Sequence, residues 1–284
     1  MTTKSSTTPA DQTLEIPPRT SRRGRSTGRR KRYRYLRSAA TAIGALAFVI
    51  VVWEAIVRFF EIPLYLVAAP SDVWTSLVDD RSILLENLWP TTVESVLGFL
   101  LGNLVAVILA IIFVYNKALE EALFPLAIVL RTVPIVAIAP VLVLMLGTGY
   151  APKIIIAALI SFFPTLVNMV KGFRAVDAQV FELMQVLSAS KREVFSHVRI
   201  YSSLPFLFAA LKIAAPAAVI GAIVAEWIGA KEGLGYLIIQ ATYNFNTPLL
   251  YSTMLLGSVL SIAFFVVIGL IEKATVRWET TEQA

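Results

Sequence analysis

The stretch that decides the fold is residues 92–114, TVESVLGFLLGNLVAVILAIIFV, whose 23 residues include a single charged side chain, Glu94. At about 1.5 Å per residue, a helix of this length spans about 34 Å, enough for the roughly 30 Å hydrocarbon core of a bilayer. Within it, Gly98 and Gly102 form a GxxxG pattern, which is typical of a helix-packing surface. The stretch therefore predicts a membrane-spanning helix.

Five further stretches share this apolar character and are separated by polar or turn-forming linkers. They are residues 39–58, 123–146, 153–172, 204–229 and 250–272. The chain of 284 residues is 57% hydrophobic and 15% charged, with a mean hydropathy of +0.74. Soluble proteins have about 45–50% apolar and about 25% charged residues. The composition excludes a water-soluble enzyme, and we expect an all-α, polytopic membrane protein with six transmembrane helices.

The residue inventory argues against a metal site and against catalysis. The chain has no cysteine, which excludes disulfides and thiolate metal ligands. Its one histidine, His197, excludes paired-histidine metal centres. The apolar stretches hold no Ser/His or paired-Asp constellation, so we expect neither catalytic residues nor a metal.

Basic residues are concentrated at the N-terminus. Residues 1–38 hold eleven Lys and Arg against two acids, so the remaining chain carries −3 of the net charge of +6. Such a run could bind nucleic acid, but it leads directly into an apolar stretch. We therefore predict a disordered cytoplasmic arm that touches anionic lipid, and no nucleic-acid partner. With six spans and the N-terminus inside, the cytoplasmic segments hold 19 Lys and Arg and the external segments 4, which predicts two cytoplasmic termini.

Two linkers show helical periodicity. Between residues 61 and 91, apolar side chains recur at Val73, Trp74, Leu77 and Val78, which predicts a short helix on the outer membrane surface or, alternatively, a plain loop. The linker 176–203 has an apolar stripe on one helix face, formed by Val176, Val180, Met184 and Leu187.

The same 176–203 linker also carries signals for a second helix. Ser190 stands three residues before Glu193, a capping-box spacing that predicts a helix starting at Lys191. We expect this helix to end at Leu204-Pro205. The expected arrangement is helix, tight turn, helix on the cytoplasmic side.

This linker resembles the EAA loop of ABC-importer permeases, which runs E-A-A, three residues, Gly, nine residues and an apolar residue. Glu182 and Val198 occupy the Glu and apolar positions, and the Leu204-Pro205 pair follows. The chain departs from the motif at Leu183-Met184 and at Tyr201, and Ser188 replaces the glycine. The glycine is expected to end a helix in left-handed backbone geometry. A serine in that geometry costs about 1 kcal/mol relative to glycine. The resemblance implies that the loop is a coupling helix that docks into a cytoplasmic ATPase. The implied ATPase-coupling residues are Glu182, Ser188, Ala189, Ser190, Lys191, Arg192 and Val198.

The resemblance covers roughly residues 68–272. Segments similar to sulfonate/taurine/nitrate-type permeases are APSDVW (69–74), RTVP (131–134), AEW (225–227) and GLGY (233–236), whereas residues 147–177 are closer to pyrimidine-type members. The basic tail (1–38) lies outside the resemblance. We expect the rest of the chain to comprise a first transmembrane helix with an external interfacial segment (39–88), an ABC type-1 transmembrane domain (89–273) and a cytoplasmic C-terminal tail (274–284).

The chain contains no G-x-x-x-x-G-K-[ST] motif, so we expect it to bind no cofactor itself. The resemblance implies that ATP and Mg²⁺ are held by separate ATPase subunits. It also implies solute delivery by an external binding protein, pairing with a second permease copy, and alternating access. The alternative is a secondary transporter driven by an ion gradient; we find no inverted repeat, and only Glu226 is a candidate coupling acid.

Four residues are candidates for the translocation path. Pro134 and Pro164 interrupt predicted spans, and the backbone carbonyls they free are tolerated where they line a cavity. Glu226 could line the path or hydrogen-bond to a neighbouring helix. Arg131 could meet an anionic solute, but we favour snorkelling to the cytoplasmic surface. We expect Glu94 to be interfacial. The solute itself stays open among sulfonates, taurine, nitrate and pyrimidines.

Overall fold

The structure, a computed structural model, describes residues 27–276, and their regular secondary structure is entirely helical. This confirms the predicted all-α class. The elements are α1 (Thr27–Phe59), α2 (Pro70–Asp79), α3 (Arg81–Tyr115), α4 (Lys117–Thr132), α5 (Ile135–Leu146), α6 (Tyr150–Arg174), α7 (Ala178–Val186), α8 (Lys191–Val194), a π-helical turn η1 (Phe195–Arg199), α9 (Ile200–Glu226), α10 (Leu234–Tyr243) and α11 (Thr247–Thr275).

The chain divides into two units, residues 1–52 and 53–284. In the first unit the structure describes residues 27–52, all of which belong to α1. They include most of the predicted span 39–58. Residues 27–38 also belong to α1, so the prediction of a disordered arm is wrong for them. Arg, Lys and Leu favour helices, and no proline interrupts this stretch. The rest of the predicted arm, residues 1–26, and residues 277–284 of the predicted C-terminal tail lie outside the described residues.

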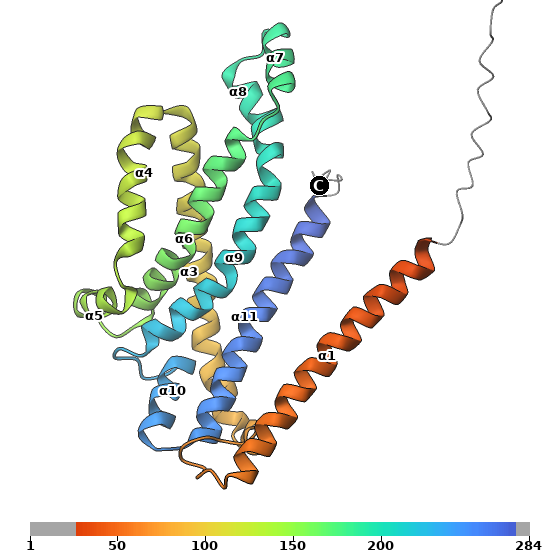
Figure 1. The fold of residues 1–284 in the computed structure, drawn as a ribbon. Coiled ribbons are helices and arrows are strands. Elements are labelled where there is room, and N and C mark those ends of the chain that lie inside the picture. Colours follow the sequence, from red (N-terminus) through yellow and green to blue (C-terminus); the bar gives the residue numbers. More distant parts are fainter. Residues whose placement is uncertain (1–26, 277–284) are drawn as a thin grey trace, which may run out of the picture. The chain divides into compact units, whose positions relative to one another are not determined.

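In the second unit α6 packs along both α3 and α9, and α11 lies against α9 (Figure 1). The contact between α3 and α6 depends on the predicted GxxxG surface. A Cβ added at Gly98 would overlap the Cβ of Ala157, and one added at Gly102 would overlap the carbonyl oxygen of Ala158. The two backbones therefore approach each other as closely as glycine allows, which confirms this stretch of α3 as a packing surface.

Four helical runs of the described residues are long and apolar enough to cross a membrane. They are residues 81–115, 150–174, 191–226 and 247–275. They contain most or all of the predicted spans 92–114, 153–172, 204–229 and 250–272. α3 begins eleven residues earlier than predicted, because residues 81–91 continue the helix through Pro90. The total of six spans stays a prediction.

The predicted span 123–146 is not one continuous helix. α4 ends at Thr132, and α5 begins at Ile135 with Pro134 as its N-cap residue, at φ −62° and ψ 120°. Proline has no N–H to donate and disfavours helical geometry in the residue before it, here Val133. The chain therefore breaks within the apolar stretch.

Pro205 does not end the second helix of the 176–203 linker, contrary to prediction. Helical structure continues from Lys191 through η1 and Pro205 to Glu226. A proline inside a helix removes one hydrogen bond, here the one to the carbonyl of Tyr201. The helix tolerates that loss.

α2 confirms the predicted short helix between residues 61 and 91. Its Val73 is buried, and the Ser252 hydroxyl of α11 donates to the Val73 carbonyl at 3.0 Å. Trp74 on the same helix is 69% exposed. The placement of α2 on the outer membrane surface stays a prediction.

Candidate functional site

The 176–203 linker contains a tight turn between α7 and α8. At the end of α7, the amide of Ala189 donates to the Met184 carbonyl at 3.0 Å, and that of Ser188 donates to the Gln185 carbonyl at 2.9 Å. These two bonds define a Schellman motif, which requires a left-handed residue just after the helix. Ser188 takes that conformation, with φ +56°. The left-handed geometry expected at this position is present, with serine in place of glycine.

The predicted capping box that starts α8 is confirmed. The Ser190 amide donates to Glu193 Oε2 at 2.7 Å, and the Glu193 amide donates to Ser190 Oγ at 3.3 Å. The two residues thus satisfy backbone donors that the helix itself leaves unpaired. We call the segment Ala178–Arg199, comprising α7, the turn, α8 and η1, the coupling loop.

The coupling loop lies at one end of the helical bundle (Figure 1), and it exposes apolar side chains. Leu183 is 57% exposed, Leu187 66% and Val186 81%, and no residue of α7 is buried. Among the predicted coupling residues, Ala189 and Val198 are half-buried; the exposed ones are Glu182, Ser188, Ser190, Lys191 and Arg192. An apolar surface this exposed is typical of a protein-binding site.

The second half of the loop is anchored to the membrane-crossing helices by aromatic contacts. The Phe195 ring lies 5.2 Å from that of Tyr115 at the end of α3 and 5.4 Å from that of Phe173 near the end of α6. A cavity of about 380 Å³ between the loop and α3 is lined by Val114, Tyr115, Phe181, Gln185, Ala189, Lys191, Val194, Phe195 and Arg199. The loop is therefore in direct contact with the ends of α3 and α6.

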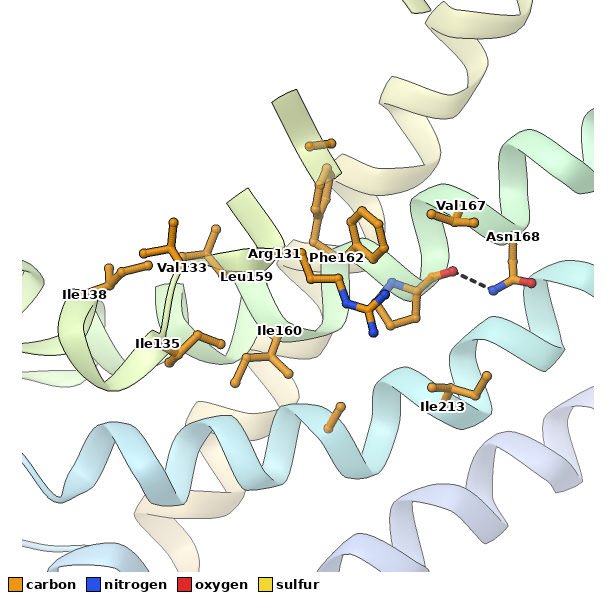
Figure 2. Close-up of a pocket in the computed structure, with 14 residues that line it drawn as sticks. Arg131, Val133, Ile135, Ile138, Leu159, Ile160, Phe162, Val167, Asn168 and Ile213 are labelled. Carbon is orange, nitrogen blue, oxygen red and sulfur yellow. Dashed lines mark hydrogen bonds between the residues drawn. The ribbon is translucent and has the colours of Figure 1, made fainter. Parts of the chain in front are cut away.

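A second cavity, of about 530 Å³, lies among α4, α5, α6 and α9 (Figure 2). It is lined by Ala127, Arg131, Val133, Ile135, Ile138, Leu159, Ile160, Phe162, Phe163, Pro164, Val167, Asn168, Ile213 and Ala217. Of the predicted path residues, Pro164 lines this cavity, and both chain neighbours of Pro134 do so. Because proline has no N–H, Pro164 leaves the carbonyl of Ile160, another lining residue, without its helical donor.

Only two side chains that line this membrane cavity are strongly polar. The Arg131 guanidinium carbon lies 5.0 Å from the centre of the Phe163 ring, a cation–π arrangement. Asn168 donates through Nδ2 to the Pro164 carbonyl at 2.7 Å, as Figure 2 shows. The cavity thus combines an apolar and aromatic wall with one cation and one amide.

Glu226 lies elsewhere, in a buried polar cluster between α3, α6 and the end of α9. Glu94 is fully buried, and Glu226 and Lys153 are 1% and 4% exposed. Lys153 Nζ donates to Glu94 Oε1 at 2.7 Å, and Thr91 Oγ1 donates to Glu226 Oε1 at 2.6 Å. The expected interfacial position of Glu94 stays a prediction, and the structure adds that both Glu94 and Lys153 are buried between helices. Of the two possibilities for Glu226, the structure has the hydrogen bond to a neighbouring helix.

The polar cluster also holds the segment that follows α9. Glu226 Oε2 accepts from the Gly235 amide, Thr91 Oγ1 accepts from the Leu234 amide at 2.8 Å, and Asn87 Oδ1 accepts from the Gly233 amide at 2.9 Å. Gly233 has φ +111° and lies against the Glu226 carboxylate, so no side chain fits there. Hydrogen bonds thus join the AEW segment to the GLGY segment. Asn87 and Thr91 were missed, because nothing local in the sequence pairs them with residues about 140 positions away.

The candidate sites contain no obvious place for a metal ion. Among residues 27–276, no group of three or more His, Asp or Glu side chains is arranged to hold one. The described residues thus form an exposed loop linked to a bundle of apolar helices, and this bundle borders a largely apolar cavity. These features define a multi-pass membrane transport protein.

Comparisons with known proteins identify the family. Residues 102–278 match the family described as binding-protein-dependent transport system inner membrane component. The formylaminopyrimidine transport permease protein ThiX of Halalkalibacterium halodurans is 32% identical over 80% of this chain and 91% of its own length. The putative aliphatic sulfonates transport permease protein SsuC of Bacillus subtilis is 30% identical over 66% of this chain and 68% of its own length.

A solved structure agrees with this assignment at the level of the fold. A chain of the MetNI methionine ABC transporter, in an inward-facing conformation, matches with a TM-score of 0.59 at 17% identity, over 68% of this chain and 95% of that one. The chain belongs to the binding-protein-dependent transport system inner membrane component family and is the permease of an ABC importer. The alternative of a gradient-driven secondary transporter is not favoured.

Proposed function

We propose that this permease imports a small solute with energy from a separate cytoplasmic ATPase that docks on the coupling loop. The observation that carries the proposal is the tight turn at Ser188, beside which Val186 and Leu187 are 81% and 66% exposed and available to a partner. ATP and Mg²⁺ are then held by the ATPase, and this chain contributes no residue to hydrolysis. The predicted coupling residues Glu182, Lys191 and Arg192 supply charged contacts around the apolar ones.

The loop geometry supports a mechanism of alternating access. When the ATPase subunits close, they displace the coupling loop, and the Phe195 contacts with Tyr115 and Phe173 transmit that movement to α3 and α6. α6 also forms one wall of the membrane cavity, beside Pro164. A shift of α6 relative to α4 and α5 therefore changes which side of the membrane the cavity faces. The break at Pro134 gives α4 and α5 the freedom to respond.

The family membership supports three further parts of the proposal. An external binding protein delivers the solute, two copies of this chain form a homodimer around the path, and both termini are cytoplasmic. The solute is a pyrimidine-type or sulfonate/taurine/nitrate-type molecule, a range supported by the names of the relatives ThiX and SsuC. Pro134 and Pro164 border the path, whereas the hydrogen bonds of Glu226 support a role in fixing the segment after α9.

Co-purification with the cognate ATPase tests the docking surface. Val186→Asp places a charge on the most exposed apolar residue of α7 without disturbing internal packing, and we expect it to abolish association in detergent. Gln179→Asp adds the same charge to an exposed position on the same helix and serves as the matched control. If the wild-type chain retains no ATPase, or if Val186→Asp and Gln179→Asp behave alike, the coupling loop is not the docking site.

A further inference from the structure

Arg131 contacts Phe163, which stands near the middle of α6. α6 runs from Tyr150 to Arg174, and Phe163 stands 13 residues after its start and 11 before its end. At a rise of about 1.5 Å per residue, Phe163 is about 20 Å from one end of this membrane-crossing helix and about 16 Å from the other. The Arg131 guanidinium is 5.0 Å from the Phe163 ring. The cation therefore lies near the middle of the length of α6, a helix long and apolar enough to cross a membrane.

A second contact gives the same position along α6. Arg174 forms an ion pair with Glu120, which joins one end of α6 to the beginning of α4. Arg131 is eleven residues beyond Glu120 on α4, and Phe163 is eleven residues before Arg174 on the antiparallel α6. Both routes place Arg131 about 16 Å from this ion pair. In this structure the guanidinium lies over the Phe163 ring, an arrangement that differs from the snorkelling towards that surface which the sequence favoured.

The Arg131 charge has no acidic partner among residues 27–276. The ion pairs of this part of the chain involve Arg58, Lys117, Lys153, Arg174 and Lys212. A cation inside the bilayer is costly, so such residues face a water-filled cavity or pair with an anion, and they mark substrate pathways. Arg131 faces the membrane cavity, where the carbonyl-bound amide of Asn168 is the only other strongly polar side chain.

We infer that Arg131 binds the anionic group of the transported solute in the membrane cavity, and that this solute is a small organic anion. The guanidinium fork matches a carboxylate, sulfonate or phosphate, and the aliphatic lining with Phe162 and Phe163 accommodates an apolar or aromatic body. The cavity volume of about 530 Å³ suits a molecule of that size. The inference rests on the proposed import function and narrows its solute to one charge class. A lipid phosphate has the same chemistry and is separated from a solute by the test.

The absence of native cysteine allows a direct test in the full chain. Ile213→Cys places one thiol on the cavity wall contributed by α9, and its rates of reaction with sulfonatoethyl and trimethylammonioethyl methanethiosulfonate are compared in phosphatidylcholine vesicles. After correction for free-thiol reactivity, the anionic reagent should react about tenfold faster beside an unpaired cation. Arg131→Met should remove this preference. Lys117→Met, which deletes an exposed cation from the same helix, should retain it.

Competition then identifies the source of the anion. Benzenesulfonate should protect the thiol, whereas benzenesulfonamide, which is nearly the same size and uncharged, should not. A thiol that does not react, a preference that survives Arg131→Met, or equal protection by the two compounds overturns the inference. If phosphatidylglycerol in the vesicles removes the preference and benzenesulfonate gives no protection, the occupant is a lipid and the inference also fails. None of these measurements involves the ATPase, so failure here leaves association at the coupling loop unaffected.

Discussion

At the residue scale, the ion pair of Glu94 and Lys153 is the contact whose loss should lower the stability of the fold most. Both groups are buried between α3 and α6. Lys153→Met leaves the Glu94 carboxylate buried with no counter-charge, while Glu226 lies in the same cluster. Breaking a buried pair in this way costs about 3–5 kcal/mol. We expect a large fall in the thermal unfolding midpoint of the purified chain in detergent.

The double variant Glu94→Gln/Lys153→Met is the informative comparison for that pair. It removes both charges together, so no isolated ion is left in the core, and it should recover much of the lost stability. Lys117→Met, which breaks the exposed pair of Lys117 with Glu121, should change the midpoint little. A Lys153→Met variant as stable as the wild type would show that the pair is unimportant for folding.

Ser188 is the residue at which the turn of the coupling loop holds conformational strain. Its φ of +56° costs a residue with a Cβ about 1–2 kcal/mol, a cost that glycine avoids. Ser188→Gly should therefore slow hydrogen–deuterium exchange of the Ala189 amide, which closes the Schellman motif. Ser188→Val should accelerate it, because a β-branched residue tolerates this region poorly. Identical exchange in the two variants would contradict the left-handed turn.

At the element scale, the close packing of α3 on α6 depends on glycine. A Cβ at Gly98 would overlap Ala157, so Gly98→Ala should force the helices apart and lower the unfolding midpoint. Gly269→Ala is the matched control, because a Cβ at that position of α11 meets no atom within 4 Å. Alanine also favours a helix over glycine by about 0.5–1 kcal/mol, so the control should be neutral or stabilised. Equal effects of the two substitutions would contradict the packing.

An element could be predicted from the sequence when the interactions that form it join residues close together in the chain. The core of α3 and the capping box of Ser190 with Glu193 depend on neighbours in the chain, and both were predicted. Residues 81–91 were not predicted to be helical, because their polar side chains interrupt the apolar pattern. The helix of the apolar span nevertheless continues through them. The bond between Thr91 and Glu226 joins residues 135 positions apart, and that of Glu94 with Lys153 joins residues 59 apart. No local pattern encodes such pairs.

At the scale of the whole molecule, the longest helical run that could cross a membrane is longer than the hydrocarbon core of a bilayer is thick. The run Lys191–Glu226 has 36 residues, which corresponds to about 54 Å against a hydrocarbon core of about 30 Å. Its length exceeds the thickness of the core by more than 20 Å. The coupling loop lies at one end of this run and the segment Trp227–Gly233 at the other (Figure 1), so we expect the two segments on opposite sides of the membrane.

This arrangement predicts opposite accessibility for single cysteines placed at the two ends of the run. Lys231→Cys, in the segment after α9, should react with a membrane-impermeant maleimide added to intact cells. Gln185→Cys, exposed on α7, should react only after the membrane is permeabilised, because the proposed ATPase lies on that side. Both residues are exposed, so burial cannot explain a difference between them. The reverse pattern would invert the orientation, and labelling of both in intact cells would show that the run does not cross the membrane.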